Sequence, residues 1–278
     1  MQLSLGTANF GCHYGFKNKR INLNLAKTIF LNLKKYKISN IDTAFDYYSF
    51  FNILPKLMVN SLKLNTKISF KNKCFNYKTL EKEIRKALLT LKIKNFECLM
   101  VHDFYLLSNK EINKTNLLLQ KLKKNYLIKK VGISVYSPAE LVKTWSIWKP
   151  DVVQLPLNLI DKRFLETGWI NRLKRSNIEI EVRSIFLQGI LLSPPDIIKN
   201  KKLQNIVKKF IIWSSQHSVS RINACLSFIK EQNIDRIIFG TETRNQLNEF
   251  LKAFKSERFF YPKNFFQKNK YLVDPRYW

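Results

Sequence analysis

Short apolar segments alternate with amphipathic stretches along almost the whole chain. The repeat is roughly 30 residues long, which is typical of βα units. The eight apolar segments match the number of strands that a closed barrel needs, so the sequence predicts an α/β fold with a single (β/α)8 TIM barrel. The predicted strands are 2–6, 38–42, 63–69, 97–102, 129–134, 151–155, 178–184 and 235–239.

The stretches between these segments carry apolar residues three and four positions apart, which predicts amphipathic helices. Ser137 and Ser220 are predicted to cap two of them. An added helix over about 202–214 is predicted beyond the seventh strand. The other predicted helices are Thr79–Leu91, Asn116–Lys123, Pro138–Trp148, Arg163–Arg175 and Arg221–Glu231.

The length of 278 residues suits one barrel, so we expect a single domain over 1–278. Its aromatic C-terminal segment, 255–278, is predicted either to fold over the barrel mouth or to pack on the outer helices. The opening lacks the pattern of a signal peptide, and no apolar run is long enough for a membrane span, which together favour the cytoplasm. The four cysteines are scattered, which predicts neither disulfides nor a metal site.

Charge leaves two interpretations open. The chain has 49 basic and 20 acidic residues, a net charge of +29, and such an excess often indicates a polyanionic partner. The lysines are spread from Lys17 to Lys270 and form no single block. We therefore favour a solvated basic surface, with no nucleic acid and no membrane as partner, that attracts a phosphate-bearing cofactor or substrate.

Reactive side chains fall at the ends of three successive predicted strands. Asp42 ends one strand, and Tyr47 follows it five residues later. Lys67 lies near the end of the next strand, and His102 closes the third. A tyrosine is a useful proton donor only when a nearby cation lowers its pKa of about 10, and Lys67 is the predicted cation. The set matches what acid-assisted reduction of a carbonyl needs.

Each of these residues also has an ordinary structural interpretation. Asp42 suits a helix cap, Lys67 a surface lysine, and His102 a hydrogen-bonded core histidine. Two neighbours compete for the roles, Asp46 for the carboxylate and Tyr48 for the acid.

A series of short motifs runs from residue 5 to residue 249. Any one motif of this length arises often by chance, but the order of the whole series is specific. On these residues the chain resembles the aldo-keto reductase family. The motifs are Leu5-Gly6-Thr7-Ala8, Asp42-Thr43-Ala44 with Tyr47, Thr66-Lys67, Val101-His102, Gly132-Ile133-Ser134, Gln154 with Asn158, Arg183-Ser184 with Gln188-Gly189, and Gly240 followed by Gln246-Leu247 and Glu249.

The resemblance implies a role for each reactive residue. Tyr47 would be the general acid, and Lys67 would lower its pKa. Asp42 would hold Lys67, and His102 would orient the carbonyl and stabilise developing negative charge. The implied cofactor-binding residues are Gly6, Thr7, Ser134, Gln154, Arg183, Ser184, Gln188, Gly240, Arg244 and Glu249.

Three positions depart from the family pattern. Tyr48 stands where the family usually has glycine, and Val135 stands where many members have an asparagine that binds the nicotinamide amide. Arg183 stands where a tyrosine often stacks on the nicotinamide. Its guanidinium is expected to stack there instead, or to bind the pyrophosphate or an anionic substrate.

The cofactor is predicted to be NADP, with NAD as the alternative. No G-x-G-x-x-G motif follows a strand, which argues against a Rossmann site. The segment 240–244 follows the last predicted strand and leads into a helix, whose N-terminus favours a phosphate. Arg244 is the candidate contact for a 2′-phosphate, whereas Glu242 would oppose one.

The predicted function is therefore NAD(P)H-dependent reduction of a small aldehyde or ketone by a monomer. The opening (5–11, 14–15) and the ending (274–276) resemble compact family members associated with surface-sugar biosynthesis, which makes a keto-sugar a candidate substrate. One alternative is a non-catalytic, NADP-binding regulatory subunit of the same fold. Another is a basic barrel that binds nucleic acid.

Overall fold

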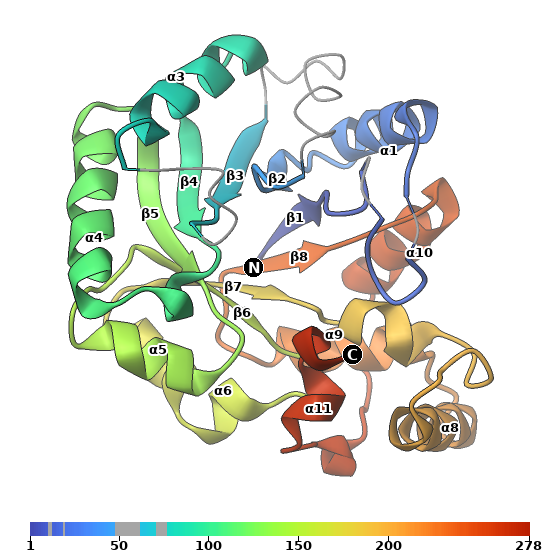
Figure 1. Cartoon of the computed structure of the whole chain (residues 1–278). Coiled ribbons are helices and arrows are strands. Elements are labelled where there is room, and N and C mark those ends of the chain that lie inside the picture. The colour runs from blue at the N-terminus through green and yellow to red at the C-terminus, as the bar shows by residue number, and fades with distance from the viewer. Residues whose placement is uncertain (11–12, 19, 48–61, 71–76) are drawn as a thin grey trace.

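The computed structural model describes residues 1–10, 13–18, 20–47, 62–70 and 77–278. Eight parallel strands close into a barrel in chain order, and β8 pairs with β1 to complete the ring (Figure 1). This confirms the predicted (β/α)8 class. The strands are β1 (Gln2–Gly6), β2 (Asn40–Asp42), β3 (Lys63–Ile68), β4 (Phe96–Val101), β5 (Ile128–Ser134), β6 (Val152–Pro156), β7 (Glu179–Arg183) and β8 (Arg236–Phe239).

Helices surround the barrel and cover the outer side of the strands (Figure 1). Short 3-10 turns occur at η3 (Phe104–Leu106), η4 (Leu187–Leu192), η5 (Lys263–Phe265) and η6 (Pro275–Tyr277). The α-helices are α1 (Leu23–Lys35), α3 (Leu80–Leu91), α4 (Asn109–Lys124), α5 (Pro138–Trp145), α6 (Arg163–Glu166), α7 (Trp169–Arg175), α8 (Lys201–Gln216), α9 (Arg221–Lys230), α10 (Arg244–Lys255) and α11 (Lys270–Val273).

Three predicted helices differ by three residues or more from the structure, where α5 ends at Trp145 instead of Trp148. Helix α4 begins well before residue 116 because Ser108 and Glu111 form a capping box at its N-terminus. The helix predicted over 163–175 is two helices, since Gly168 adopts φ 73° between α6 and α7 and so interrupts the helical backbone.

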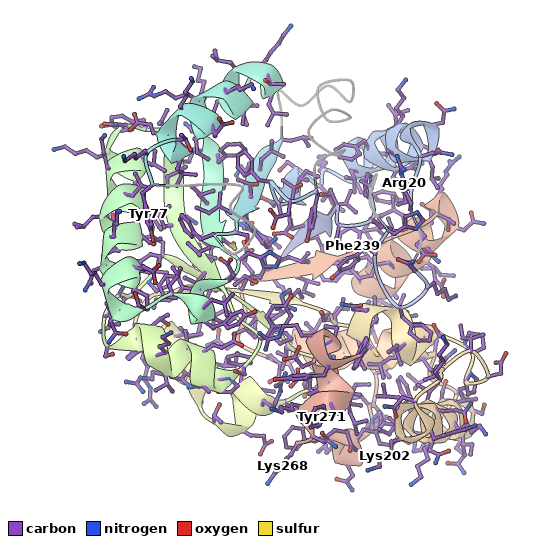
Figure 2. All side chains as sticks on the ribbon, viewed as in Figure 1. Arg20, Tyr77, Lys202, Phe239, Lys268 and Tyr271 are labelled. Atoms are coloured by element: carbon purple, nitrogen blue, oxygen red, sulfur yellow. The ribbon has the colours of Figure 1, made fainter. Side chains whose placement is uncertain are left out.

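Apolar side chains face inward from the helices and basic ones face solvent. In α3, Leu80, Ile84 and Leu88 are buried on one face. Figure 2 shows Lys202 and Lys268 at the periphery of the molecule, and both are exposed. This distribution agrees with lysines dispersed over a solvated surface. Within the described part of the chain, no helix is both long and apolar enough to cross a membrane.

The C-terminal segment packs beside the barrel. Helix α11 and η6 follow α10, and Arg276 stacks on the ring of Tyr136 with its guanidinium carbon 4.0 Å from the ring centre. No residue of 255–278 lines the cavity at the barrel mouth described below, although Tyr136 does. The segment thus packs against Tyr136, one of the residues that line the cavity.

The described cysteines are buried free thiols. Cys98 lies on β4 and Cys225 on α9, and neither forms a disulfide. Cys12 and Cys74 lie outside the described residues.

The close packing around Gly132 of β5 leads us to expect that a larger side chain there lowers stability. A Cβ at this position would lie 2.8 Å from Met100 Cγ and 3.1 Å from the carbonyl oxygen of Val152. The backbone oxygen belongs to a paired strand and has little room to move, so we expect Gly132→Ala to lower the free energy of unfolding by about 1–3 kcal/mol. Gly240→Ala is the control, because a Cβ there meets nothing within 4 Å. Urea denaturation of both variants measures the difference, and equal stabilities would contradict the close packing at Gly132.

Candidate active site at the barrel mouth

The segment that carries Tyr47 remains paired with β3 after β2 ends. The amide of Thr43 donates to Asn65 O at 2.9 Å, and the amide of Phe45 donates to Lys67 O at 2.9 Å. The amide of Tyr47 then closes a turn onto Ala44 O at 3.0 Å. These bonds start the Tyr47 loop directly against the end of the strand that carries Lys67.

Asp42 and Lys67 form a buried ion pair. Lys67 Nζ donates to the two Asp42 carboxylate oxygens at 2.7 and 2.6 Å, and to Thr43 O at 3.2 Å. Lys67 is only 3% exposed and Asp42 only 6%. Because a buried charge without a partner costs several kcal/mol, each group stabilises the other in this position.

A cavity of about 730 Å³ opens above this pair at the carboxyl ends of the strands. It brings together most of the residues that the sequence singled out, but Ser134 and Arg244 are not among its lining residues. The predicted residues that do line it are Asp42, Tyr47, Lys67, His102, Gly6, Thr7, Gln154, Arg183, Ser184, Gln188, Gly240 and Glu249. The rival acid Tyr48 lies outside the described residues.

The Tyr47 hydroxyl is set up to keep its proton. Tyr47 is partly exposed toward the cavity, yet loss of hydration raises its pKa well above the usual value, and Tyr14 and Asp42 raise it further. The Arg183 charge opposes this rise in pKa. The Lys67 charge is balanced by its two bonds to Asp42, and its predicted effect on the Tyr47 pKa stays a prediction. The phenol is therefore protonated at neutral pH, as a proton donor must be, although a pKa nearer the operating pH would make it a stronger acid.

Two further tyrosines line the cavity and were missed as site residues. Tyr14 is 41% exposed as a residue, but its phenol lies among the cavity groups, where desolvation raises its pKa to about 12. Tyr136 follows β5 by two residues and lies beside Arg183. Only the position of Tyr136 just beyond a strand end offered a signal in the sequence.

Arg183 is held between a carbonyl and an aromatic ring. One of its terminal nitrogens donates to Val135 O at 3.1 Å, and its guanidinium carbon lies 4.0 Å from the Tyr136 ring centre. Arg276 lies at the same distance over the same ring. The Tyr136 ring therefore packs against two guanidinium groups. Arg276 is paired with Glu140 and Asp274, at 2.8 and 2.6 Å.

A polar network continues from Asp42 down the inside of the barrel. Gln154 Nε2 donates to Asp42 Oδ1 at 2.9 Å and to Glu181 Oε2 at 3.2 Å. Asn65 donates to Glu181 at 2.6 Å, and Arg236 forms an ion pair with the same carboxylate. Gln154, Glu181 and Arg236 are register neighbours across β6, β7 and β8, which is why they point to the same side. Burial raises the pKa of Glu181, and the Arg236 charge opposes that shift.

Buried polar atoms at the mouth suit a ligand amide. Gln154 Oε1 and Ser134 Oγ are buried and have no hydrogen-bond partner among the described residues. They lie on neighbouring strands in direct register. An unsatisfied buried polar atom costs about 1–3 kcal/mol, so a carboxamide that bonds to these atoms would bind favourably. The arrangement fits the nicotinamide end of the implied cofactor.

The other end of the cavity is built by the loop between β8 and α10. Glu242 and Glu249 line it, and the Thr243 hydroxyl caps α10 by accepting from the amide of Gln246 at 3.1 Å. Arg244 is exposed at the first position of the helix. Glu242 and Glu249 therefore line this end of the cavity, whereas Arg244, the predicted contact for a 2′-phosphate, is exposed at the start of α10.

The family model for the aldo/keto reductases matches residues 2–260, and the chain belongs to the aldo/keto reductase family. Members of this family are oxidoreductases that act on carbonyl compounds and use nicotinamide cofactors, and the family match supports an oxidoreductase here. No curated protein matches the sequence significantly.

Solved structures of this family share the fold. A glycerol dehydrogenase from Gluconobacter oxydans is 19% identical with a TM-score of 0.70, covering 92% of this chain and 87% of its own. A holo-form aldo-keto reductase from Bacillus halodurans is 15% identical with a TM-score of 0.72, covering 93% and 88%. A putative aldo-keto reductase from Pseudomona aeruginosa is 17% identical with a TM-score of 0.65, covering 91% and 88%. At these identities the similarity establishes the barrel fold alone.

Proposed function

We propose that this protein reduces the carbonyl group of a small aldehyde or ketone, with keto-sugars among the candidates, and that Tyr47 donates the proton. The observation that carries the proposal is the buried Asp42–Lys67 ion pair at the floor of a cavity that Tyr47 and His102 line. A nicotinamide cofactor, when bound, supplies the hydride.

Each residue then has a defined task. Tyr47 holds its proton until negative charge develops on the carbonyl oxygen, and transfers it there. His102 lines the same cavity and donates a hydrogen bond that orients the carbonyl. Asp42 and Lys67 fix each other beneath the phenol, so the site needs little reorganisation during the reaction.

The test is oxidation of NADPH and NADH by the purified protein against a panel of aldehydes, ketones and nucleotide-activated keto-sugars. Turnover that depends on Tyr47 supports the proposal. Tight cofactor binding without turnover on any carbonyl would instead favour the non-catalytic regulatory subunit.

We propose NADPH as the preferred cofactor, with Arg244 contacting the 2′-phosphate. Arg244 is exposed, so we expect Arg244→Ala to weaken NADPH binding by about 1.5 kcal/mol, roughly tenfold, without affecting NADH. Glu242 lines the cavity on the same loop, so Glu242→Gln should strengthen NADPH binding by removing a like charge. Fluorescence titration measures both affinities.

The control for this prediction is Lys252→Ala, which removes an exposed cation from the other end of the same helix, α10. Equal affinities of the wild type for NADPH and NADH, unchanged in Arg244→Ala, would point to NAD as the cofactor.

We also propose that the protein acts as a cytoplasmic monomer on a small-molecule substrate, without nucleic acid or membrane as partner. The dispersed, exposed lysines favour this over a nucleic-acid site. Salt-sensitive binding to DNA or RNA in a mobility assay would contradict it.

A further inference from the structure

We infer that the carbonyl substrate carries an anionic group, a carboxylate or a phosphate, and that Arg183 binds it. The inference rests on the proposed carbonyl reduction and specifies its substrate class. Arg183 and Tyr47 line the same cavity, and the Arg183 charge acts on the phenols of both Tyr47 and Tyr14. A substrate whose carbonyl reaches Tyr47 therefore shares the cavity with the Arg183 guanidinium.

Apart from Lys17, an exposed lysine that also lines the cavity, the other cations around this part of the cavity already have partners. Lys67 is paired with Asp42, and Arg276 is paired with Glu140 and Asp274. Arg221 lines the cavity farther along, and its donors bond to three consecutive backbone carbonyls at the end of η4, at 2.9 to 3.0 Å.

Arg183 differs from these cations. Its polar contact among the described residues is the single bond to Val135 O, and none of these residues forms an ion pair with it. A guanidinium has five N–H donors, so most of its donors remain available. Burial of part of this side chain without a counter-charge is costly, and an anionic ligand in the cavity would remove that cost.

The structure also fixes the direction of the guanidinium before a ligand binds. The stack of Arg183 on Tyr136, a ring that Arg276 also contacts, restricts an otherwise flexible side chain. A guanidinium that is already oriented loses less conformational entropy when it forms a bidentate contact with a carboxylate or phosphate.

Charge on the rest of the molecule favours the same ligand class. The carboxylates that line the cavity are Asp42, which is neutralised by Lys67, and Glu242 and Glu249, which belong to the loop and helix that follow β8. The net charge of +29 attracts anions toward the surface, an effect that salt weakens. An anionic substrate therefore meets unbalanced positive charge both on approach and at Arg183.

The test compares two aldehydes that differ in one anionic group, 4-carboxybenzaldehyde and 4-methylbenzaldehyde. For the wild type we expect kcat/KM to be higher for the carboxylate. Arg183→Gln should lower the ratio of the two kcat/KM values, carboxylate over methyl, by about 10- to 100-fold. Arg183→Lys should retain part of the preference, because it keeps the charge but loses the planar fork. Lys86→Gln, which removes an exposed cation on α3, is the control for net charge.

A binding measurement separates this inference from the proposed reaction. Calorimetry of the cofactor-loaded protein with 4-carboxybenzyl alcohol and 4-methylbenzyl alcohol should show preference for the carboxylate in the wild type and its loss in Arg183→Gln. If no aldehyde is reduced but this preference is present, the anion site stands and the reaction fails. If Arg183→Gln weakens both alcohols equally, or weakens NADPH binding while the preference persists, Arg183 serves the cofactor and the inference is overturned.

Discussion

Tyr47→Phe should lower kcat by about 10² to 10⁴-fold and leave cofactor affinity nearly unchanged, because it removes the transferable proton but little of the ring's shape. The raised pKa of Tyr47 keeps the wild-type phenol protonated at neutral pH, so the wild type should hold its activity well into the alkaline range. Steady-state kinetics measures the change in kcat, and fluorescence titration measures the affinity for NADPH.

Lys67→Met should also lower kcat strongly, since it leaves the Asp42 carboxylate without its partner beneath the phenol. Because both changes act on the same proton transfer, the double variant should be little worse than the more damaging single one. Tyr48→Phe is the matched control. Loss of activity in Tyr48→Phe, with Tyr47→Phe active, would shift the assignment of the acid by one residue.

Glu181→Gln should lower the free energy of unfolding by about 3–5 kcal/mol, the range found when one member of a buried ion pair is removed. Glu181 is fully buried, and Arg236, its partner, is 5% exposed. The variant keeps the shape of the side chain but leaves the Arg236 guanidinium without a full counter-charge inside the barrel. Thermal and urea denaturation measure the loss.

An exposed pair provides the comparison. Glu81→Gln weakens contacts with Arg85 and Lys121, whose side chains are 51% and 64% exposed, and should cost less than about 1 kcal/mol. The double variant Glu181→Gln with Arg236→Gln should lose less than the sum of the two single changes, because it removes both charges together. Additive losses would mean that Glu181 and Arg236 do not stabilise each other.

The barrel could be predicted because its signals are local. Each strand is a short apolar run, and most predicted strands agree with the observed ones to within one or two residues, with β2 shortened to Asn40–Asp42. The closeness of Asp42 and Lys67 followed from strand order alone, since parallel strands deliver their ends to one mouth. Helix α1 was not among the predicted helices, although Asn22 caps its first turn by accepting from the amide of Leu25.

Contacts between residues far apart in the sequence could not be predicted. Nothing near Glu181 indicates that its carboxylate faces the barrel interior, because its partners Asn65 and Arg236 are 116 and 55 positions away. The stack of Arg183 and Arg276 on Tyr136 likewise joins a strand, a loop and the C-terminal segment. Such packing depends on how the closed barrel brings these segments together.

The buried polar network also limits how this barrel can be recombined. Asp42, Asn65 and Lys67 come from the first four strands, whereas Gln154, Glu181 and Arg236 come from the last four. The hydrogen bonds from Gln154 to Asp42 and from Asn65 to Glu181 cross between the two halves. A chimera that joins either half to half of another barrel with an apolar interior would leave buried charged and polar groups without partners. The two halves of this protein are therefore not interchangeable modules.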